Sequence, residues 1–499
     1  MTRDYNKIFK NIRLNGFFSE YLPPCFSLKE KMFSEIPQAN CDLIKPYSFT
    51  MSRFNINNAR RTIFIPEIGA YAVVNDYVKD NNILEELTKF IDTNSESFSK
   101  LIMEDGSIMR HEQVYDKSLL EGEKISSQYI NNVVEKTIKS AGAKKVLKID
   151  IANCFASIYT HFIPAILLGY DIAEDNYKRT LKKEPTNNTY DKYKKLDDAI
   201  RKQNTNQTNG LLVGPLLSQL IVEALLTRID IELKEKDILF SRYLDDYEVY
   251  LFEKSKDEII SIFVSILRKY GLSLNFEKIE LIDFPYYVVE NFDRIIEYYR
   301  KNRVEDYDLV KLFNDFFEME KSGTKGAIRY LLKSIERKPI QFDNKKLFNS
   351  YILTIMANDS RSLTKACSLL INNHPRYSID ENYIKCIKRL LHVNIEKSYD
   401  LEVVWLLYVL IETNNIAKDD EIVHSILSSK NDLAKIMILR NKLTTDVKDI
   451  LDNASSWILN YELYANDNLD EKDLCNRLSL DKNIDMYRKL KENELHFCY

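Results

Sequence analysis

The sequence contains little glycine and little proline, and neither is spread evenly along the chain. Only 11 of its 499 residues are glycine, and no glycine follows Gly326. After Gly326, only Pro339 and Pro375 interrupt a composition rich in Leu, Ile, Lys and Glu. Such a segment does not easily build β-hairpins or phosphate-binding loops, which depend on glycine. We therefore expect the C-terminal part of the chain to be helical.

Charge and cysteine spacing exclude two further classes of protein. The 71 Lys and Arg residues are balanced by 75 Asp and Glu residues, so the chain lacks the overall positive field of a protein that covers a long duplex. Any binding of nucleic acid must be local. The seven cysteines show no Cys-x-x-Cys or Cys/His ligand spacing, which argues against a zinc site and favours a reducing compartment.

Long apolar segments are also missing. The first ten residues, MTRDYNKIFK, contain no apolar signal region, and the longest apolar run, 403–411, is too short to span a bilayer. The length is sufficient for several domains with a substantial core. We expect a soluble, cytoplasmic protein.

Three zones follow one another along the chain. Residues 1–75 hold several prolines and indicate short elements joined by turns. From 76 to 290, strand-like runs alternate with amphipathic helices, which is typical of an α+β fold. Within this zone the patterns predict a strand at 145–150, a helix at 155–170 interrupted by Pro164, a helix at 211–233, two strands around a turn in 238–252, and a helix at 259–272. Beyond 290, helical periodicity recurs and resembles an irregular α-solenoid, with helices predicted at 309–320, 327–335, 383–393 and 403–412.

A locally basic segment, 178–202, lies inside the second zone. It is either a nucleic-acid contact or a solvated loop, since acidic residues are interspersed with the basic ones.

Three acidic residues form the set that carries chemistry. Asp150 ends the strand predicted at 145–150, and Asp245 and Asp246 occupy the turn predicted within 238–252. Adjacent acids on a tight turn repel each other unless cations lie between them. Nucleotidyl transfer uses two divalent metal ions held by carboxylates at the ends of neighbouring strands. The pattern therefore favours a metal site.

The order of motifs around these acids resembles the palm of reverse transcriptases. The strand that ends on Asp150 leads into DIANCF, and NGLLVGPLLSQ, YLDD and GLSLNFEK follow in turn. Reverse transcriptases have an Asp strand, a Gly-x-x-x-Gly turn into a helix, a Tyr-x-Asp-Asp hairpin and a Gly-Leu-x-x-Asn-x-x-Lys segment in the same order. The resemblance implies reverse-transcriptase-like α+β fingers and a ferredoxin-like palm, and a DNA polymerase that uses two Mg²⁺ ions, with Mn²⁺ as an alternative.

The resemblance assigns roles to the residues that match. Asp150, Asp245 and Asp246 are the catalytic, metal-binding acids. Phe155 lies where these polymerases place an aromatic gate, whose ring leaves no room for a 2′-hydroxyl and so favours deoxynucleotides. Without the surrounding motif, the sequence would predict Phe155 to be a core aromatic residue.

Three further residues are assigned to nucleotide binding. Arg61 in RRTIFIP resembles the fingers arginine that binds the incoming triphosphate, with help from Arg60 or Arg53. Lys278 matches the lysine of the fourth palm motif, which interacts with or protonates the leaving pyrophosphate; a plain surface lysine is the alternative. Gly214 ends the Gly-x-x-x-Gly turn, where glycine allows the backbone to approach closely.

This turn departs from the pattern of templated reverse transcriptases. They carry Gly-x-Pro-Gln-Gly, whereas Leu212 and Val213 stand here at the Pro and Gln positions. The amide that lies near the nascent base pair is therefore absent, which puts template reading in doubt and leaves phosphoryl chemistry untouched.

Several other segments resemble the Abi polymerases, abortive-infection reverse transcriptases typified by AbiK, and most of all the shorter version carried by P2-type prophages. The resemblance implies a template-independent, protein-primed DNA polymerase in antiphage defence, which uses dNTPs and leaves its single-stranded DNA product covalently attached. It implies reverse-transcriptase-like fingers and palm in residues 1–290, an all-α domain of HEAT-like repeats in residues 291–499, and a trimeric or hexameric homo-oligomer without membrane attachment. The segments are YLPPCFS, NARRTIF, SIYTHFIP, SRYLDDYEVY and KGAIRYLL.

Self-priming requires a protein hydroxyl that reaches the metal site. The sequence contains 31 tyrosines and does not identify the one that primes synthesis. Tyr5 and Tyr21, in the irregular N-terminal zone, are the candidates. The alternative for each is an ordinary packed or exposed tyrosine. Two other functions stay open: a templated RNA-directed DNA polymerase that uses a dedicated noncoding RNA, and an inactive polymerase-like scaffold.

Overall fold

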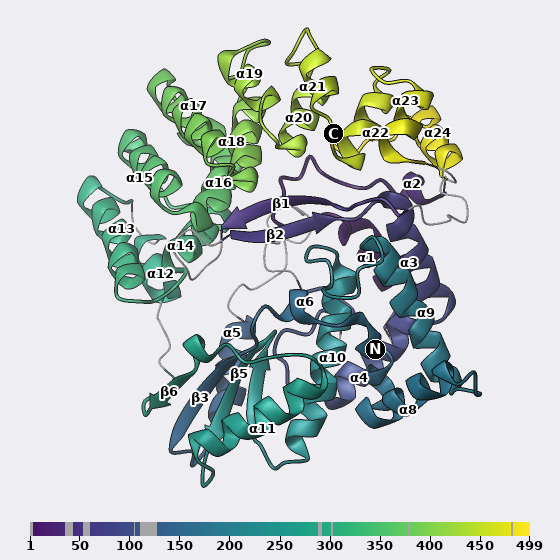
Figure 1. Ribbon diagram of the computed structural model, residues 1–499. Helices are drawn as coiled ribbons and strands as arrows, with labels where there is room; N and C mark the ends of the chain where they lie inside the picture. The colour runs from purple at the N-terminus through teal and green to yellow at the C-terminus, as the bar shows by residue number, and fades with distance from the viewer. Residues whose placement is uncertain are drawn as a thin grey trace.

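A four-stranded sheet with its helices and a long arc of helices form the two ends of the molecule, with a two-stranded hairpin between them (Figure 1). The structure is a computed structural model. It describes residues 3–34, 43–52, 60–103, 105–109, 127–287, 292–300, 303–377, 379–480 and 483–499.

The N-terminal zone consists of short elements joined by turns, as its prolines predict. Two strands pair antiparallel in the hairpin, two helices precede it, a third begins at the end of the zone and a fourth lies beyond residue 75. The elements are α1 (Tyr5–Asn15), α2 (Glu30–Ser34), β1 (Tyr47–Ser52), β2 (Arg60–Ile65), α3 (Ile68–Asp80) and α4 (Ile83–Asn94).

The larger sheet has the strand order β4-β5-β3-β6, with all neighbours antiparallel. Its apolar face packs in one core with two long helices, so only the opposite face is open. The strands are β3 (Lys145–Asp150), β4 (Phe240–Tyr243), β5 (Asp246–Leu251) and β6 (Glu280–Asp283), and the two helices are α10 (Leu216–Lys234) and α11 (Lys256–Lys269). The predicted strand at 145–150 and the predicted strand pair in 238–252 are confirmed. A further helix, α5 (Ser127–Lys139), precedes β3.

Two predicted helices differ from the structure for reasons that the sequence contains. The helix expected at 155–170 is divided into α6 (Cys154–Ser157), a 3₁₀ turn (Thr160–Phe162) and α7 (Ala165–Leu168) around Pro164. The helix expected at 211–233 begins only at Leu216, because Pro215 is its N-cap and lacks the backbone N–H that a helix interior requires.

The basic segment 178–202 is not a solvated loop. It lies mainly in α8 (Tyr170–Leu181) and α9 (Asn188–Gln203), where several of its cations pair with acidic side chains. Lys178 lies 3.1 Å from Glu174, and Lys192 lies 2.7 Å from Glu86. Since neighbouring acids balance part of this charge, the segment offers a weaker field for nucleic acid than its lysine content suggests.

The glycine-free C-terminal part is helical, as predicted. Alternate helices contact one another in two rows, α13-α15-α17-α19 and α14-α16-α18-α20-α22, and the rows curve as an arc (Figure 1). The helices are α12 (Phe292–Arg300), α13 (Asp306–Lys321), α14 (Ala327–Arg337), α15 (Lys345–Asn358), α16 (Ser360–Tyr377), α17 (Glu381–Glu396), α18 (Asp400–Glu412), α19 (Glu421–Leu427), α20 (Asp432–Arg440), α21 (Lys448–Asp452), α22 (Trp457–Ala465), α23 (Glu471–Leu478) and α24 (Ile484–Glu492). Within the described ranges, none of the helices is long and apolar enough to cross a membrane.

The hydrophobic cores divide the chain differently from its secondary structure. The palm sheet has a core of its own, whereas the apolar side chains of residues 17–71 belong to the core of the helical arc. Trp405 and Trp457 of the arc donate indole hydrogen bonds to the carbonyls of Tyr21 and Ile65. The predicted boundary at residue 290 follows the change from strands to helices and stays a prediction.

An ion pair fastens the hairpin to α18. Arg60 of β2 donates two hydrogen bonds to the buried Glu402, and its guanidinium lies 4.0 Å from the ring centre of Tyr399. The neighbouring strand adds a hydrogen bond of 2.8 Å from the Thr50 amide to Asp400. The hairpin is thereby held against the helical half by partners far away in the sequence.

This anchor is testable by substitution. We expect Glu402→Ala to lower the melting temperature by about 5 °C, because it leaves the largely buried Arg60 guanidinium without its counter-charge. Thermal denaturation followed by circular dichroism measures the change. Glu421→Ala, at an exposed position that opens α19, is the matched control and should shift the midpoint by less than about 1 °C. Equal shifts in both variants would contradict the anchor.

Candidate active site

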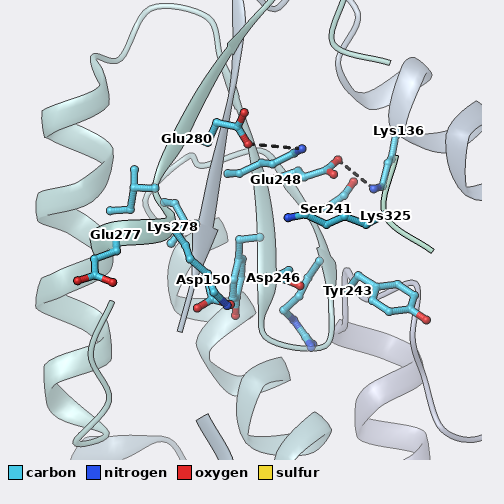
Figure 2. A pocket seen from close by; sticks show the side chains of 15 residues that line it. Lys136, Asp150, Ser241, Tyr243, Asp246, Glu248, Glu277, Lys278, Glu280 and Lys325 are labelled. Atoms are coloured by element: carbon cyan, nitrogen blue, oxygen red, sulfur yellow. Dashed lines mark hydrogen bonds and ion pairs between the residues drawn. The ribbon is translucent and has the colours of Figure 1, made fainter. Parts of the chain in front are cut away.

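The register of the central strands brings two acids together. Asp150, the last residue of β3, is paired with Asp246, the first residue of β5. Side chains alternate along a strand, so Lys148 and Glu248 share the face of these acids while the intervening residues enter the core. This open face lines a cavity of about 620 Å³, and Figure 2 shows Asp150, Asp246 and Lys278 gathered at one end of it.

The turn that carries Asp245 is fixed on both sides of Leu244, whose φ of 53° is left-handed. The Leu244 amide donates to Ser99 Oγ at 2.6 Å, and the Leu244 carbonyl accepts a 2.9 Å bond from Arg242. A left-handed leucine is strained, and these bonds keep it in place.

The carboxyl groups are held where their charges are disfavoured. Desolvation by the surrounding protein, the charge of Asp245 and a hydrogen bond with Asp150 raise the pKa of Asp246 from 3.8 to about 7, although part of the residue faces the open cavity. Burial and the charge of Asp150 also raise the pKa of Asp245, against the opposing charges of Arg61 and Lys278. The site therefore favours the arrival of positive charge.

Lys278 supplies one such charge. Its Nζ lies 2.8 Å from Asp150 Oδ1, and Asn275 donates to the other oxygen of the same carboxylate at 3.0 Å. Of the two alternatives for Lys278, the structure thus favours a place in the site over that of an isolated surface lysine.

The alternation along β2 separates the two arginines of the hairpin. Arg60 turns to the helical half, so Arg61 must project from the opposite face, and its charge acts on Asp245. Arg61 is exposed, and no ion-pair partner of it is found within the part of the chain that the structure describes. Arg53 lies outside the described residues. Arg60 therefore stabilises the fold, while Arg61 is left for a ligand.

Gly214 joins the motif turn to the same hairpin. Its φ is 138°, and a Cβ there would lie 2.5 Å from the carbonyl oxygen of Phe64, which requires glycine. The Phe64 amide donates to the Val213 carbonyl at 2.7 Å. Phe155 is half-buried against the palm core, and its carbonyl accepts a bond from Leu211.

The two candidate priming tyrosines lie away from the cavity. Tyr5 opens α1 and packs against the palm core, and Tyr21 packs against the core of the helical arc. Neither is among the residues that line the cavity. Their role stays a prediction.

The acids suit a divalent cation by their chemistry, since Mg²⁺ prefers carboxylate oxygens. In the described ranges, however, no three or more His, Cys, Asp or Glu side chains are grouped closely enough to hold a metal ion as they stand. Lys278 balances part of the charge instead, and the raised pKa of Asp246 lets it bind a proton at a higher pH than an ordinary aspartate. Asp150, Asp245 and Asp246 are the residues that would hold the cation.

Comparison with known proteins decides the family. Residues 74–331, more than half of the chain, match the reverse transcriptase (RNA-dependent DNA polymerase) family. The chain belongs to the reverse transcriptase family. The match implies nucleotidyl transfer with nucleotide and nucleic-acid substrates, and reverse transcriptases generally use divalent metal ions such as Mg²⁺.

The similarity to solved structures is remote. A telomerase from Candida albicans, solved with a TWJ fragment of telomeric RNA, is 14% identical over 76% of this chain and 65% of its own, with a TM-score of 0.31. The apo telomerase from Candida tropicalis is 13% identical over 76% of this chain and 69% of its own, with a TM-score of 0.30. The chain thus spans about 65% of the length of the first of these telomerases. No curated protein matches the chain.

The motifs of this reverse transcriptase did not reveal one residue that supports the catalytic turn. Arg242 is fully buried and its guanidinium is bound by Glu223 and Asp230 of α10 at 2.8 Å each, while it also holds the Leu244 carbonyl. Glu223 and Asp230, two of the three acids inside the apolar helix predicted at 211–233, are a signal that could have found it, because buried carboxylates require a cationic partner.

The raised pKa of Asp246 links stability to pH. Because its carboxyl group binds a proton more tightly in the folded chain than in the unfolded chain, the folded state loses stability as the pH rises from 3.8 to about 7. Asp246→Asn removes this loss, so at pH 8 in EDTA the variant should melt about 2 °C above the unsubstituted chain, with a smaller difference at pH 5.

The control for this measurement is Asp237→Asn, at an exposed left-handed position that asparagine tolerates. Mg²⁺ should raise the melting temperature of the unsubstituted chain and have little effect on Asp246→Asn. A lower melting temperature for Asp246→Asn at pH 8 would contradict the assignment.

Arg242 is expected to act by positioning the turn. Arg242→Lys keeps the charge but cannot bind both acids and the Leu244 carbonyl, so we expect kcat for nucleotide incorporation to fall at least about tenfold while KM for dNTP changes less than about twofold. Steady-state kinetics below the melting temperature of the variant separate this effect from unfolding. Arg268→Lys, exposed on α11, is the control, and loss of kcat in both variants would argue against positioning.

Proposed function

We propose that this reverse transcriptase is a template-independent, protein-primed DNA polymerase that acts in antiphage defence. In this proposal it is an Abi polymerase of the AbiK type, most like the shorter version carried by P2-type prophages. Its substrates are dNTPs, and its product is single-stranded DNA that stays covalently attached to the chain. It acts in the cytoplasm as a trimeric or hexameric homo-oligomer.

The observation that carries template independence is the packing of the Gly-x-x-x-Gly turn. Leu212 stands where templated enzymes have proline and is buried, and Val213 stands at the glutamine position and packs against the core of the helical arc. The backbone of this turn is bonded to Phe64 of the fingers hairpin. Neither side chain presents a hydrogen-bonding group to a base, so no residue of the turn replaces the missing amide.

The chemistry itself follows from the acids and the cations around them. Two bound Mg²⁺ ions would lower the pKa of the attacking hydroxyl and neutralise the triphosphate. Asp150, Asp245 and Asp246 would hold these metal ions at the strand ends, and Arg61 would bind the triphosphate from the hairpin. Lys278, already bound to Asp150, is placed to give a proton to the leaving pyrophosphate.

Two parts of the proposal concern where the DNA strand begins and where it leaves the palm. Tyr5 or Tyr21 supplies the first hydroxyl, and because neither lines the cavity, priming requires movement of the N-terminal segment or a second copy of the chain. The helical rows, which we assign to HEAT-like repeats, form a wall along which the growing strand leaves the palm.

One alternative is kept because the acid set and cavity serve it equally well. A templated RNA-directed DNA polymerase that uses a dedicated noncoding RNA would copurify with a defined RNA species. An inactive scaffold would have no reason to keep three repelling acids at the ends of neighbouring strands.

The test is incubation of the purified chain with labelled dNTPs and Mg²⁺, without added primer or template. We expect label that stays with the protein through denaturation and is released by nuclease. The variant with Asp245→Asn and Asp246→Asn should lose all synthesis and keep its fold, since it removes metal-binding charge and not volume. A requirement for added template and primer would reject template independence, and synthesis by the double variant would reject the acid assignment.

A further inference from the structure

The cavity of the palm is bounded in part by the helical half. Lys325 lies in the loop between α13 and α14 and lines the cavity together with residues of β3, β4, β5 and β6. Figure 2 shows its side chain over the sheet face that carries Ser241 and Glu248. A residue from outside the palm therefore contributes to the space beside the catalytic acids.

The lysines that line the cavity lie beside carboxylates, with one exception. Lys278 is bound to Asp150 at 2.8 Å, Lys136 to Glu248 at 2.9 Å, and Lys148 lies 3.9 Å from Glu280. Lys325 is exposed, and within the described part of the chain no carboxylate lies at ion-pair distance from its ammonium. An ammonium group that enters a cavity without a protein partner is available to an anionic ligand.

The loop that carries Lys325 depends on backbone conformation and not on packing. Gly323 and Gly326 have φ values of 107° and 86°, and a Cβ at either position would meet no atom within 4 Å. Both glycines are thus required for the path of the loop. This loop joins two helices of the arc and brings Lys325 to the cavity of the palm.

The position of the cavity indicates which anion it receives. Asp150 and Asp246 line it, whereas Asp245 and Arg61 do not, and the charge of Arg61 acts on Asp245. The arginine assigned to the incoming triphosphate therefore does not line the cavity. A space of about 620 Å³ that is lined by residues of four strands and not by Arg61 suits the DNA strand that is being extended.

We propose that Lys325 binds a backbone phosphate of the DNA strand in the palm, so that the helical half takes a direct part in holding the strand near its growing end. The proposal rests on the proposed polymerase function. A single lysine on a flexible stem contacts phosphate without reading sequence, so the contact contributes affinity and not specificity.

The experiment measures binding of a fluorescein-labelled single-stranded oligothymidylate to the full chain by anisotropy, without dNTPs, over a series of KCl concentrations. We expect Lys325→Ala to bind about fivefold more weakly at physiological salt and to lower the slope of log affinity against log salt by about 0.7, the value for one lost phosphate contact on a single strand. Lys325→Arg should restore affinity and slope, because it keeps the charge.

Lys321→Ala is the matched control, since Lys321 is exposed at the end of α13 and does not line the cavity. Unchanged affinity and slope in Lys325→Ala, or equal losses in Lys321→Ala, would overturn the inference. If the unsubstituted chain incorporates dNTPs while Lys325→Ala binds normally, only this inference fails. If the unsubstituted chain neither binds the strand nor incorporates dNTPs, the proposed function fails with it.

Discussion

The active site depends on the pairing of β3 with β5, which places Asp150 opposite Asp246. Two carboxylates at directly opposed positions of an antiparallel pair repel each other, so this contact opposes the fold. The opposite face of the same strands provides the compensation, because their alternate residues are buried against α10 and α11. Apolar packing on the other side of the sheet thus keeps the two carboxylates together despite their repulsion. Lys278, a proton or metal ions relieve this repulsion.

The turn between β4 and β5 needs a second support. Arg242 bridges Glu223 and Asp230 beneath the sheet and binds the Leu244 carbonyl, so the buried ion pairs and the catalytic turn share one guanidinium. Removal of this side chain would leave two buried carboxylates without a cationic partner, which explains why such a cation lies inside an apolar core. The rigid planar fork of arginine can satisfy these acceptors together, and lysine cannot.

The hairpin β1–β2 connects the palm to the helical half. Because successive residues of a strand point to opposite faces, Arg60 reaches Glu402 while Arg61 is directed to the acids. The turn at Gly214 packs on the same hairpin through Phe64. A change in the position of α18 would therefore affect both Arg61 and the turn at Gly214. Lys325 forms a second connection, from the arc to the open face of the palm.

Local patterns were enough to predict much of this molecule. The strand that ends on Asp150, the hairpin around Asp245 and the helical C-terminal part follow from side-chain period and from the placement of glycine and proline, and these act over a few residues. The motif order pointed to the acids, Lys278 and Gly214, and the structure places Asp150, Asp246 and Lys278 in the lining of one cavity. Pro215 and Pro164 in the sequence also explain the late start of α10 and the interruption of the helix expected at 155–170, since proline acts on its own neighbours.

Only the tertiary structure decided which of several equivalent charged residues pair with one another. Nothing local distinguishes Arg60, which binds Glu402 342 residues away, from Arg61, whose charge acts on Asp245. The same holds for Arg242, whose two acids lie on another element, and for Lys325, which enters the palm from the arc. Such pairings are set by which surfaces the chain buries together, and a sequence pattern of short range does not contain that information.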